Sequence, residues 1–119
     1  MANVNSYRDL IVWQHAMDIC VQIYETTGSF PNAETYGLTN QIRRCSISIP
    51  SNIAEGHARP TRDYARFLNI ARGSLNELCT QIEIAYRIGY ISEDKFGALM
   101  YDLNMLGRQL NALIRKIRG

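Results

Sequence analysis

The sequence predicts an all-α protein that folds as an antiparallel, up-down-up-down four-helix bundle. Along four separate stretches of the 119-residue chain, apolar residues recur every three or four positions, which is the spacing of an amphipathic helix. Glycine, proline and capping residues separate these stretches by short turns. No stretch has the pattern of a strand. Four helices of comparable length joined by short turns commonly pack as such a bundle.

A single domain accounts for residues 1–119. A chain of this length buries about two-thirds of its unfolded surface, so its core needs no disulfide or metal. The helices are expected at residues 10–27, 34–57, 62–88 and 93–117. The N-terminal stretch lacks a basic leader and a long apolar run, and no segment has the length of a membrane span. We therefore expect a cytoplasmic protein without membrane association.

The first helix is expected at residues 10–27. Asp9 is available as its N-cap, and Gly28 followed by Pro31 provides the stop signal. The apolar stripe predicted to face the core consists of Leu10, Trp13, Met17, Cys20 and Tyr24, with Ala16 and Val21 beside it.

The second helix carries separate apolar and polar rows. The predicted core row is Leu38, Ile42, Cys45, Ile49 and Ile53, and the polar row is Gln41, Arg44, Ser48, Asn52 and Glu55. Pro50 removes a backbone donor and crowds the carbonyl of Ser46. Because the apolar rhythm continues past the proline, we predict one helix that is kinked at Pro50. Gly56 is expected to end it in the left-handed conformation.

The third and fourth helices each carry one long apolar stripe. The stripe of the third helix is Tyr64, Phe67, Leu68, Ala71, Leu75, Leu78, Ile82 and Ala85, and that of the fourth is Phe96, Leu99, Leu103, Leu106, Leu110, Leu113 and Ile117. The second of these is a heptad seam, which implies left-handed supercoiling. Thr61 and Ser92 are the predicted N-caps, and Gly89 separates the two helices.

Several apolar side chains fall outside these stripes and exceed what the core of one small bundle absorbs. They are Ile47 and Ala54 on the second helix, Tyr86 and Tyr90 on the third, and Met100 and Ile114 on the fourth. Exposed apolar rows of this length usually mark an interface. We therefore expect a homo-oligomer whose contacts include Ile47, Ala54, Met100 and Ile114, the alternative being a wide core face.

The sequence offers no catalytic or metal centre. His15 and His57 lie far apart and lack the Glu-x-x-His spacing of di-iron bundles. The three cysteines, Cys20, Cys45 and Cys79, have no paired Cys-x-x-Cys or Cys/His spacing and suit buried free thiols in a reducing cytoplasm. We expect a protein that is not an enzyme and holds no cofactor or metal.

Two groups of basic residues suggest a surface for a polyanion. They are Arg59, Arg62 and Arg66 at the turn into the third helix, and Arg108 and Arg115 on the fourth helix, where Tyr101 shares their face. The net charge of +2 is too small to identify a nucleic-acid binder by itself, and an ordinary solvated surface looks similar. In a ring of identical subunits the weakly basic patch would be repeated, and the repeated patches could bind RNA or DNA multivalently.

Three motifs follow one another along the chain. They are Tyr-Arg-Asp-Leu-Ile-Val-Trp-Gln at residues 7–14, the stretch 41–56 with Arg-Arg, Ser-Ile-Pro and Asn-Ile-Ala-Glu-Gly, and Ala-Arg-Gly-Ser-Leu-Asn-Glu-Leu at residues 71–78. Together they resemble the four-helix bundle proteins of the 23S rRNA intervening sequence family, over nearly the whole chain. Cys45 departs from the family pattern, in which a small alanine is typical.

The resemblance implies a cytoplasmic bacterial homopentamer. The family is similar to the accessory proteins of diversity-generating retroelements, which are basic pentamers that bind nucleic acid. The family name records that some of its genes lie inside inserted segments of ribosomal RNA genes, and this location is no proof of RNA binding.

On this chain the resemblance implies a polar network and no catalytic residues. The motif residues are Gln41, Arg43, Arg44, Pro50, Asn52, Glu55, Gly56, Gly73, Ser74 and Glu77. Because Arg44, Glu55 and Glu77 lie off the apolar stripes, we expect ion pairs between helices or between subunits, with Arg44 and Glu55 as a coupled pair. Gly73, in the middle of the third helix, is expected at a close helix contact.

Two hypotheses about function remain open at this point. One is a ring-forming bundle that associates with RNA or DNA, in concert with a ribonucleoprotein or retroelement partner. The other is a protein-interaction scaffold without nucleic-acid affinity, whose arginines serve only its own ion pairs. The sequence identifies no protein partner for either.

Overall fold

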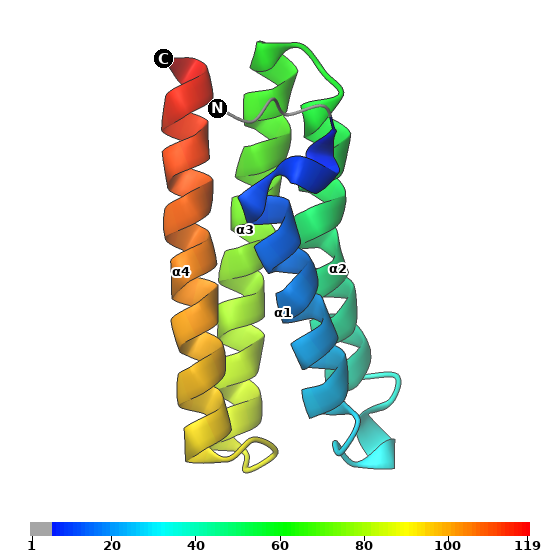
Figure 1. Ribbon diagram of the computed structural model, residues 1–119. Helices are drawn as coiled ribbons and strands as arrows, with labels where there is room; N and C mark the ends of the chain where they lie inside the picture. The colour runs from blue at the N-terminus through cyan, green and yellow to red at the C-terminus, as the bar shows by residue number, and fades with distance from the viewer. Residues whose placement is uncertain (1–5) are drawn as a thin grey trace.

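The computed structural model describes residues 6–119, and this part of the chain contains helices but no strand. The long helices are α1 (Ile11–Thr27), α2 (Leu38–His57), α3 (Thr61–Arg87) and α4 (Glu93–Arg118). Two short 3-10 helices, η1 (Tyr7–Asp9) and η2 (Asn32–Glu34), precede α1 and α2. Each long helix runs antiparallel to the next, so the predicted up-down-up-down four-helix bundle is confirmed (Figure 1).

The four helices surround one core. α2 packs against α1 and α3, and α4 packs against α3 and α1. The bundle measures 44 × 26 × 20 Å. The short α2–α3 turn and the end of α4 lie at one end of the bundle (Figure 1). The α1–α2 and α3–α4 connections, residues 28–37 and 88–92, lie at the other end, which we call the double-loop end.

The core face of α1 differs from the predicted one. Its buried residues are Val12, Ala16, Ile19, Cys20, Ile23 and Thr27. Met17, Val21 and Tyr24, expected in the core, are instead 39%, 57% and 42% exposed. α1 carries two neighbouring apolar rows, offset by one position in the sequence and so by about 100° around the helix. The periodicity alone does not indicate which row faces α2 and α4.

The start of α1 also differs from the prediction. Its N-cap is Leu10, which supplies no side-chain hydrogen bond. Asp9 instead forms a capping box with Ser6 around η1, which occupies the residues immediately before α1. Because Asp9 belongs to η1, it does not cap α1.

α2 is one helix that runs through Pro50, and its core row is buried as predicted except for the half-buried Leu38. Since proline has no N–H, the carbonyl of Ser46 loses its helical donor. The thiol of Cys20 on α1 donates to that carbonyl, with 3.0 Å between Sγ and O. A neighbouring helix therefore supplies the hydrogen bond that Pro50 removes. α2 begins at Leu38, later than expected, because η2 occupies Asn32–Glu34.

Two glycines have roles other than those predicted. Gly56 lies inside α2, and a Cβ there would be 2.7 Å from the Cβ of Phe67, so its small size permits the close approach of α2 and α3. In residues 6–119, positive φ occurs only at Gly89 and Gly119. Gly73 was expected at a close contact, yet a Cβ at this position would meet no heavy atom of residues 6–119 within 4 Å. The exposed side of α3 at Gly73 is open.

The two predicted caps of α3 and α4 have different outcomes. Thr61 is the first residue of α3 and does not cap it, because Pro60 occupies the N-cap position. Ser92 caps α4 as predicted, and its Oγ accepts a hydrogen bond from the backbone N–H of Lys95 at 3.2 Å.

The apolar seam of α4 shifts after Leu110. The next buried residue is Ile114, which is 4% exposed, whereas Leu113 is only half-buried. An α-helix drifts relative to a strict heptad repeat, so a step of four replaces the expected step of three. The prediction that Ile114 belongs to an oligomer interface is therefore wrong, because this side chain lies in the core.

Tyr86 and Tyr90, expected as surplus apolar residues, pack within this chain. The ring of Tyr86 stacks on Phe96 with 4.2 Å between centroids. Tyr90 lies against Phe30 at 5.3 Å, and its hydroxyl donates to Oε2 of Glu34 at 2.9 Å. The contacts of Tyr90 join the two connections at the double-loop end.

Candidate functional site

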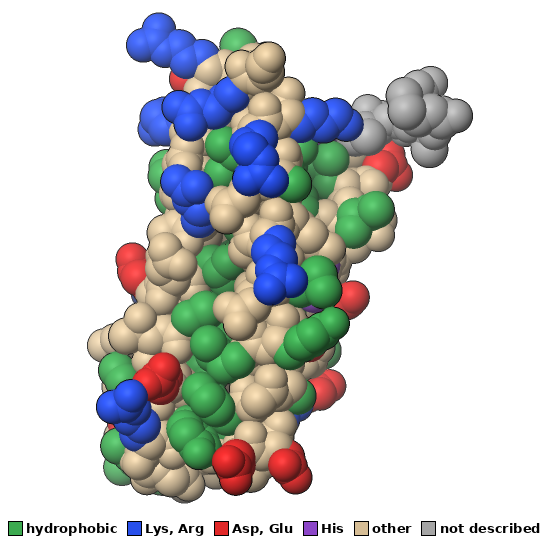
Figure 2. Space-filling view, turned by 90° about the vertical axis from the view of Figure 1, so that its left-hand side faces the viewer, with side chains coloured by type: hydrophobic (Ala, Val, Ile, Leu, Met, Phe, Trp, Pro, Cys, Tyr) green, Lys and Arg blue, Asp and Glu red, His purple; other side chains and the backbone are tan. Residues whose placement is uncertain are grey.

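Charge is divided along the α3–α4 pair. Residues 58–74 and 106–119 contain eight basic residues and one acidic residue, whereas residues 75–105 contain two basic and five acidic residues. Because α3 and α4 are antiparallel, the start of α3 lies beside the end of α4, and most Lys and Arg side chains gather at that end (Figure 2). We call this surface the basic end. Its basic residues, all exposed, are Arg59, Arg62, Arg66, Arg72, Arg108, Arg115, Lys116 and Arg118.

The basic end unites the two groups of arginines predicted separately on the third and fourth helices. Arg59 and Arg66 both lie near the ring of Phe67, at 5.2 and 4.8 Å from its centroid. Arg59 also pairs with Glu55 one turn away, and among residues 6–119 it is the only one of the eight with an acidic partner. Seven positive charges are therefore free to meet an anion.

Arg72 is a member of the basic end that the sequence analysis did not single out. Its guanidinium donates to Oδ1 of Asn111 on α4 at 3.0 Å and to Oδ1 of Asn69 at 2.7 Å. Together with Arg115 and Arg118 it lines a hollow of about 690 Å³ between α3 and α4. The three-residue spacing of Asn69 and Arg72 could have predicted their contact within α3. The contact of Arg72 with Asn111 could not be predicted, because it depends on how α3 and α4 pack.

Tyr101 lies outside the basic end. Its side chain is 67% exposed, and it shares a face of α4 with Arg108 and Arg115 at steps of seven residues. Each such step advances about 10 Å along a helix. The predicted stacking residue therefore flanks the basic end, next to the acidic Asp102.

A polar groove between α2 and α3 brings together part of the predicted network. The hydroxyls of Ser48 and Ser74 lie 2.8 Å apart, and the Asn52 amide donates to the carbonyl and hydroxyl of Ser48 at 2.8 and 3.0 Å. The Cys45 thiol donates to the carbonyl of Ser74 at 3.0 Å. Gln41, Arg44, Glu77 and Gln81 line the same groove of about 390 Å³.

Burial raises the pKa of the Cys45 thiol to about 11, and the nearby Glu77 carboxylate adds to the rise. Cys45 therefore stays a protonated donor near neutral pH, and the groove offers no thiolate nucleophile. The Oε1 atom of Gln81 is buried there without a hydrogen bond among residues 6–119. The groove is a structural network with unused polar groups at its rim.

Arg44 and Glu55 do not form the predicted pair within one chain. They are eleven positions apart on α2, which corresponds to about 16 Å of helical rise. Glu55 pairs with Arg59, and the side chain of Arg44 has no hydrogen bond or salt bridge among residues 6–119. Arg43 contacts α1, where it bonds to Thr27 and to the carbonyl of Tyr24.

An apolar groove between α1 and α2 contains two of the predicted interface residues. Ile47 is 44% exposed and Ala54 is half-buried, and both line a groove of about 340 Å³. Trp13 and Met17, predicted for the core, line it as well. Met100 lies on α4, half-buried against the core and away from this groove.

Three exposed isoleucines lie on one side of α3 and at its C-cap, where the sequence predicted no exposed apolar residue. Ile70, Ile84 and Ile88 are 42%, 47% and 52% exposed. They recur at helical spacing on the side of α3 that also carries the open Gly73. The sequence did not predict their exposure, because the periodic apolar pattern of α3 indicates only the stripe that is buried.

Metal and membrane sites are not found in the described residues. Within residues 6–119, no three His, Cys, Asp or Glu side chains lie close enough to hold a metal ion. His15 shares a hydrogen bond of 2.8 Å with Oε1 of Gln109, and the ring of His57 packs edge-on against Tyr64. None of these helices has the length and hydropathy of a membrane span.

Comparison with known proteins places this fold in a family. A solved structure, a protein with unknown function from the S23 ribosomal protein family of Bacteroides thetaiotaomicron, is similar with a TM-score of 0.81. The two share 23% sequence identity over 88% of this chain and 96% of that chain, so the likeness shows the fold. No protein with curated annotation matches. The family model for 23S rRNA-intervening sequence proteins matches residues 8–112. The chain therefore belongs to the 23S rRNA-intervening sequence protein family.

Proposed function

We propose that this protein is a non-enzymatic, ring-forming helical bundle whose basic end binds RNA or DNA as an accessory protein. The main support for the proposal is the excess of positive charge where the start of α3 adjoins the end of α4. This surface has eight basic residues and only one acidic residue in segments 58–74 and 106–119. Arginine and lysine bind nucleic acid through the phosphate backbone and release counterions. The family assignment is compatible with this function and leaves the ligand open.

Ring formation is supported by exposed apolar side chains on two different parts of the bundle. Ile47 and Ala54 line the α1–α2 groove, and Ile84 is exposed on α3 in a hollow that it shares with polar residues. A contact between unlike surfaces is heterologous and generates a ring when the rotation closes. From the resemblance we expect five subunits. Every subunit of a cyclic ring has the same orientation to its axis, so the basic ends gather on one side and act multivalently.

The binding test is fluorescence anisotropy of labelled RNA and DNA of mixed sequence at low and moderate salt. We expect both to bind, with an affinity that falls as salt rises by a logarithmic slope of about 0.7 to 0.9 for each neutralised phosphate. Arg62→Gln with Arg66→Gln, and separately Arg108→Gln with Arg115→Gln, should weaken all sequences alike and reduce that slope. Arg43→Gln with Arg44→Gln removes two charges outside the basic end and is the matched control.

The assembly test is light scattering of the Ile47→Glu variant. A charge in the α1–α2 groove should shift the measured mass towards the monomer while circular dichroism keeps its helical signal. Tyr36→Glu is the control, since Tyr36 is 95% exposed and outside the groove. An unchanged mass for Ile47→Glu would exclude this groove from the interface.

The second candidate is a protein-interaction scaffold without nucleic-acid affinity, with a protein partner still to be identified. The net charge of +2 and the engagement of Arg59 by Glu55 favour it. If neither RNA nor DNA binds at low salt, or if both pairs of substitutions leave binding unchanged, the scaffold function replaces the nucleic-acid function.

A further inference from the structure

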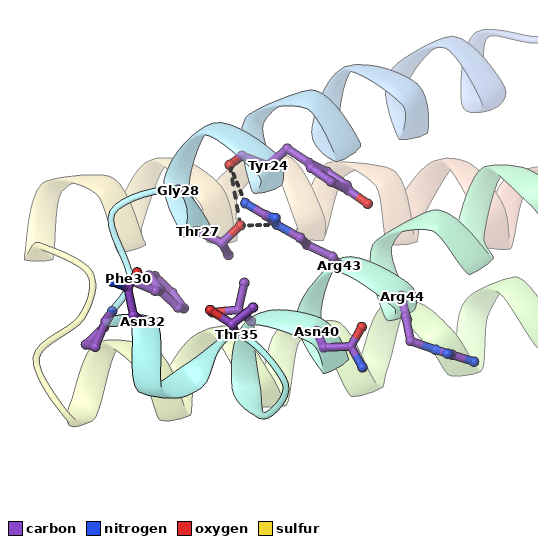
Figure 3. A pocket seen from close by; sticks show the side chains of 11 residues that line it. Tyr24, Thr27, Gly28, Phe30, Asn32, Thr35, Asn40, Arg43 and Arg44 are labelled. Atoms are coloured by element: carbon purple, nitrogen blue, oxygen red, sulfur yellow. Dashed lines mark hydrogen bonds between the residues drawn. The ribbon is translucent and has the colours of Figure 1, made fainter.

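We propose that the pocket at the α1–α2 connection binds a small phosphate-bearing ligand. The pocket has a volume of about 360 Å³ and lies at the double-loop end (Figure 3). The basic end is at the opposite end of the bundle (Figure 1). Its lining includes the hydroxyls of Thr27, Thr35 and Thr39 and the guanidinium of Arg43. The argument is independent of the nucleic-acid function proposed above.

Arg43 is held in one orientation by α1. Its Nε donates to Oγ1 of Thr27 at 2.8 Å, and its Nη2 donates to the carbonyl of Tyr24 at 3.3 Å (Figure 3). The guanidinium also lies over the ring of Tyr24, 4.5 Å from the centroid. Because arginine has five N–H donors, three remain unused. A guanidinium that is already oriented loses little freedom when it binds an anion.

Thr39 provides a second, independent indication of a ligand. It lines the pocket and is 8% exposed, and its Oγ1 is buried without a hydrogen-bond partner among residues 6–119. A buried hydroxyl without a partner destabilises the fold unless an ordered water or a ligand satisfies it. Phosphate oxygens accept hydrogen bonds from hydroxyl and guanidinium groups alike.

The charges of the lining favour an anion. Among the described residues that line the pocket, only Arg43 and Arg44 are charged, and none is Asp or Glu. Arg44 comes from the next position of α2, and its guanidinium extends away from the cavity in Figure 3. Without a hydrogen bond or salt bridge among residues 6–119, Arg44 is free to turn towards a bound anion.

The size of the pocket limits the ligand to a small molecule. A volume of about 360 Å³ is at the lower end of the range of ligand sites, which begins near 300 Å³. The amides of Asn32 and Asn40 also line it and supply donors and acceptors for groups attached to the phosphate. A free phosphate or a phosphate monoester of about nucleotide size fits these properties.

The test is a titration of the isotope-labelled protein, followed by amide chemical shifts, with inorganic phosphate and with adenosine monophosphate. Sodium chloride at matched ionic strength is the control. We expect saturable shifts in residues 27–44 with either phosphate probe and none with chloride. Equal affinities would assign the site to the phosphate group alone, and tighter binding of the monophosphate would assign it to a nucleotide.

Two variants test the roles of the named side chains. Thr39→Val keeps the shape of the side chain and removes the unpaired hydroxyl, so phosphate should bind about tenfold more weakly while the melting temperature stays equal or rises. Arg43→Gln should abolish saturation, with helicity checked by circular dichroism. Arg87→Gln is the matched control, an exposed arginine at the same end but outside the pocket.

Three results would overturn the proposal. The first is the absence of saturable shifts with either phosphate probe. The second is shifts confined to the basic end. The third is phosphate binding by Thr39→Val that equals that of the unaltered protein.

Discussion

The two ends of the bundle present arginine in different ways. At the basic end, seven basic side chains extend from α3 and α4 without an acidic partner among residues 6–119. At the double-loop end, Arg43 lies against the ring of Tyr24 and donates hydrogen bonds to two oxygens. The first arrangement is open and lies on the regular faces of two helices. The second is half-enclosed and depends on an irregular connection of ten residues between α1 and α2.

This difference teaches that arginine offers two distinct arrangements for binding an anion. Exposed arginines act by summed charge, so their effect is weakened by salt and tolerates small displacements. A guanidinium fixed by hydrogen bonds and a ring acts by geometry, so its effect depends on each contact. The predictions below test whether the two ends behave in these separate ways.

The largest effect is expected from removing four charges at the basic end. Substitution of Arg62, Arg66, Arg108 and Arg115 by Gln together should lower nucleic-acid affinity on the order of a hundredfold near 0.1 M salt and reduce the logarithmic salt slope by about 3. Fluorescence anisotropy measures both. Arg43→Gln with Arg44→Gln, at the double-loop end, should change the affinity by less than about twofold. Comparable losses from the two sets would show that the ends do not act separately.

The next effect concerns the backbone that supports the basic end. Gly56→Ala would place a Cβ against Phe67, where α2 approaches the start of α3, and should destabilise the fold by about 2 kcal/mol. Thermal or urea unfolding measures the loss. Gly97→Ala is the control, because a Cβ at Gly97 meets nothing within 4 Å and should be neutral or stabilising. If both variants have the same stability, the close approach at Gly56 is not a constraint.

A smaller effect is expected at Cys20, between the two ends. Cys20→Ala removes the donor to the Ser46 carbonyl and leaves a small void, which should cost about 1 to 2 kcal/mol in unfolding free energy. Cys20→Ser retains a donor and should cost less. Urea titration distinguishes them, with Cys79→Ala as a half-buried control. Equal losses for Cys20→Ala and Cys20→Ser would mean that the hydrogen bond contributes nothing.

The smallest effect is the coupling of charges along α2. A double-mutant cycle on Arg44 and Glu55 in the Ile47→Glu background should give no coupling energy, since about 16 Å separates the two positions. The cycle on Glu55 and Arg59 should give no more than about 0.5 kcal/mol, because the pair is exposed. A clear Arg44–Glu55 coupling in the unaltered protein that is lost in the Ile47→Glu background would place that pair across a subunit contact.

The bundle could be predicted because apolar residues recur every three or four positions in each helix. In α2 a single apolar row is enough to identify the buried face. Its row from Ile42 to Ile53 has no apolar competitor of equal length, and it is buried as predicted. α1 has two such rows, and the row containing Val12 and Ile19 is buried instead of the row containing Met17 and Tyr24. The choice depends on where α2 and α4 pack, which a single sequence does not state.

The candidate sites were predictable to different degrees. The arginines of the basic end were visible as local clusters, and antiparallel topology alone brings them together. The absence of an Arg44–Glu55 pair within one chain follows from helical rise. The phosphate pocket could not be predicted, because Arg43 meets Thr27 across a connection whose path has no periodic pattern.

The use of Cys20 as a hydrogen-bond donor beneath Pro50 also determines its chemical reactivity. Burial raises the pKa of the Cys20 thiol, although the hydrogen bond to Ser46 partly lowers it, and burial likewise raises the pKa values of Cys45 and Cys79. Near neutral pH all three are therefore poor nucleophiles that react slowly with alkylating agents while the helices stay packed. Alkylation of the buried Cys20 and Cys45 requires the bundle to open, so the rate at which each of these two thiols is trapped by iodoacetamide reports how often its helix separates from its neighbours.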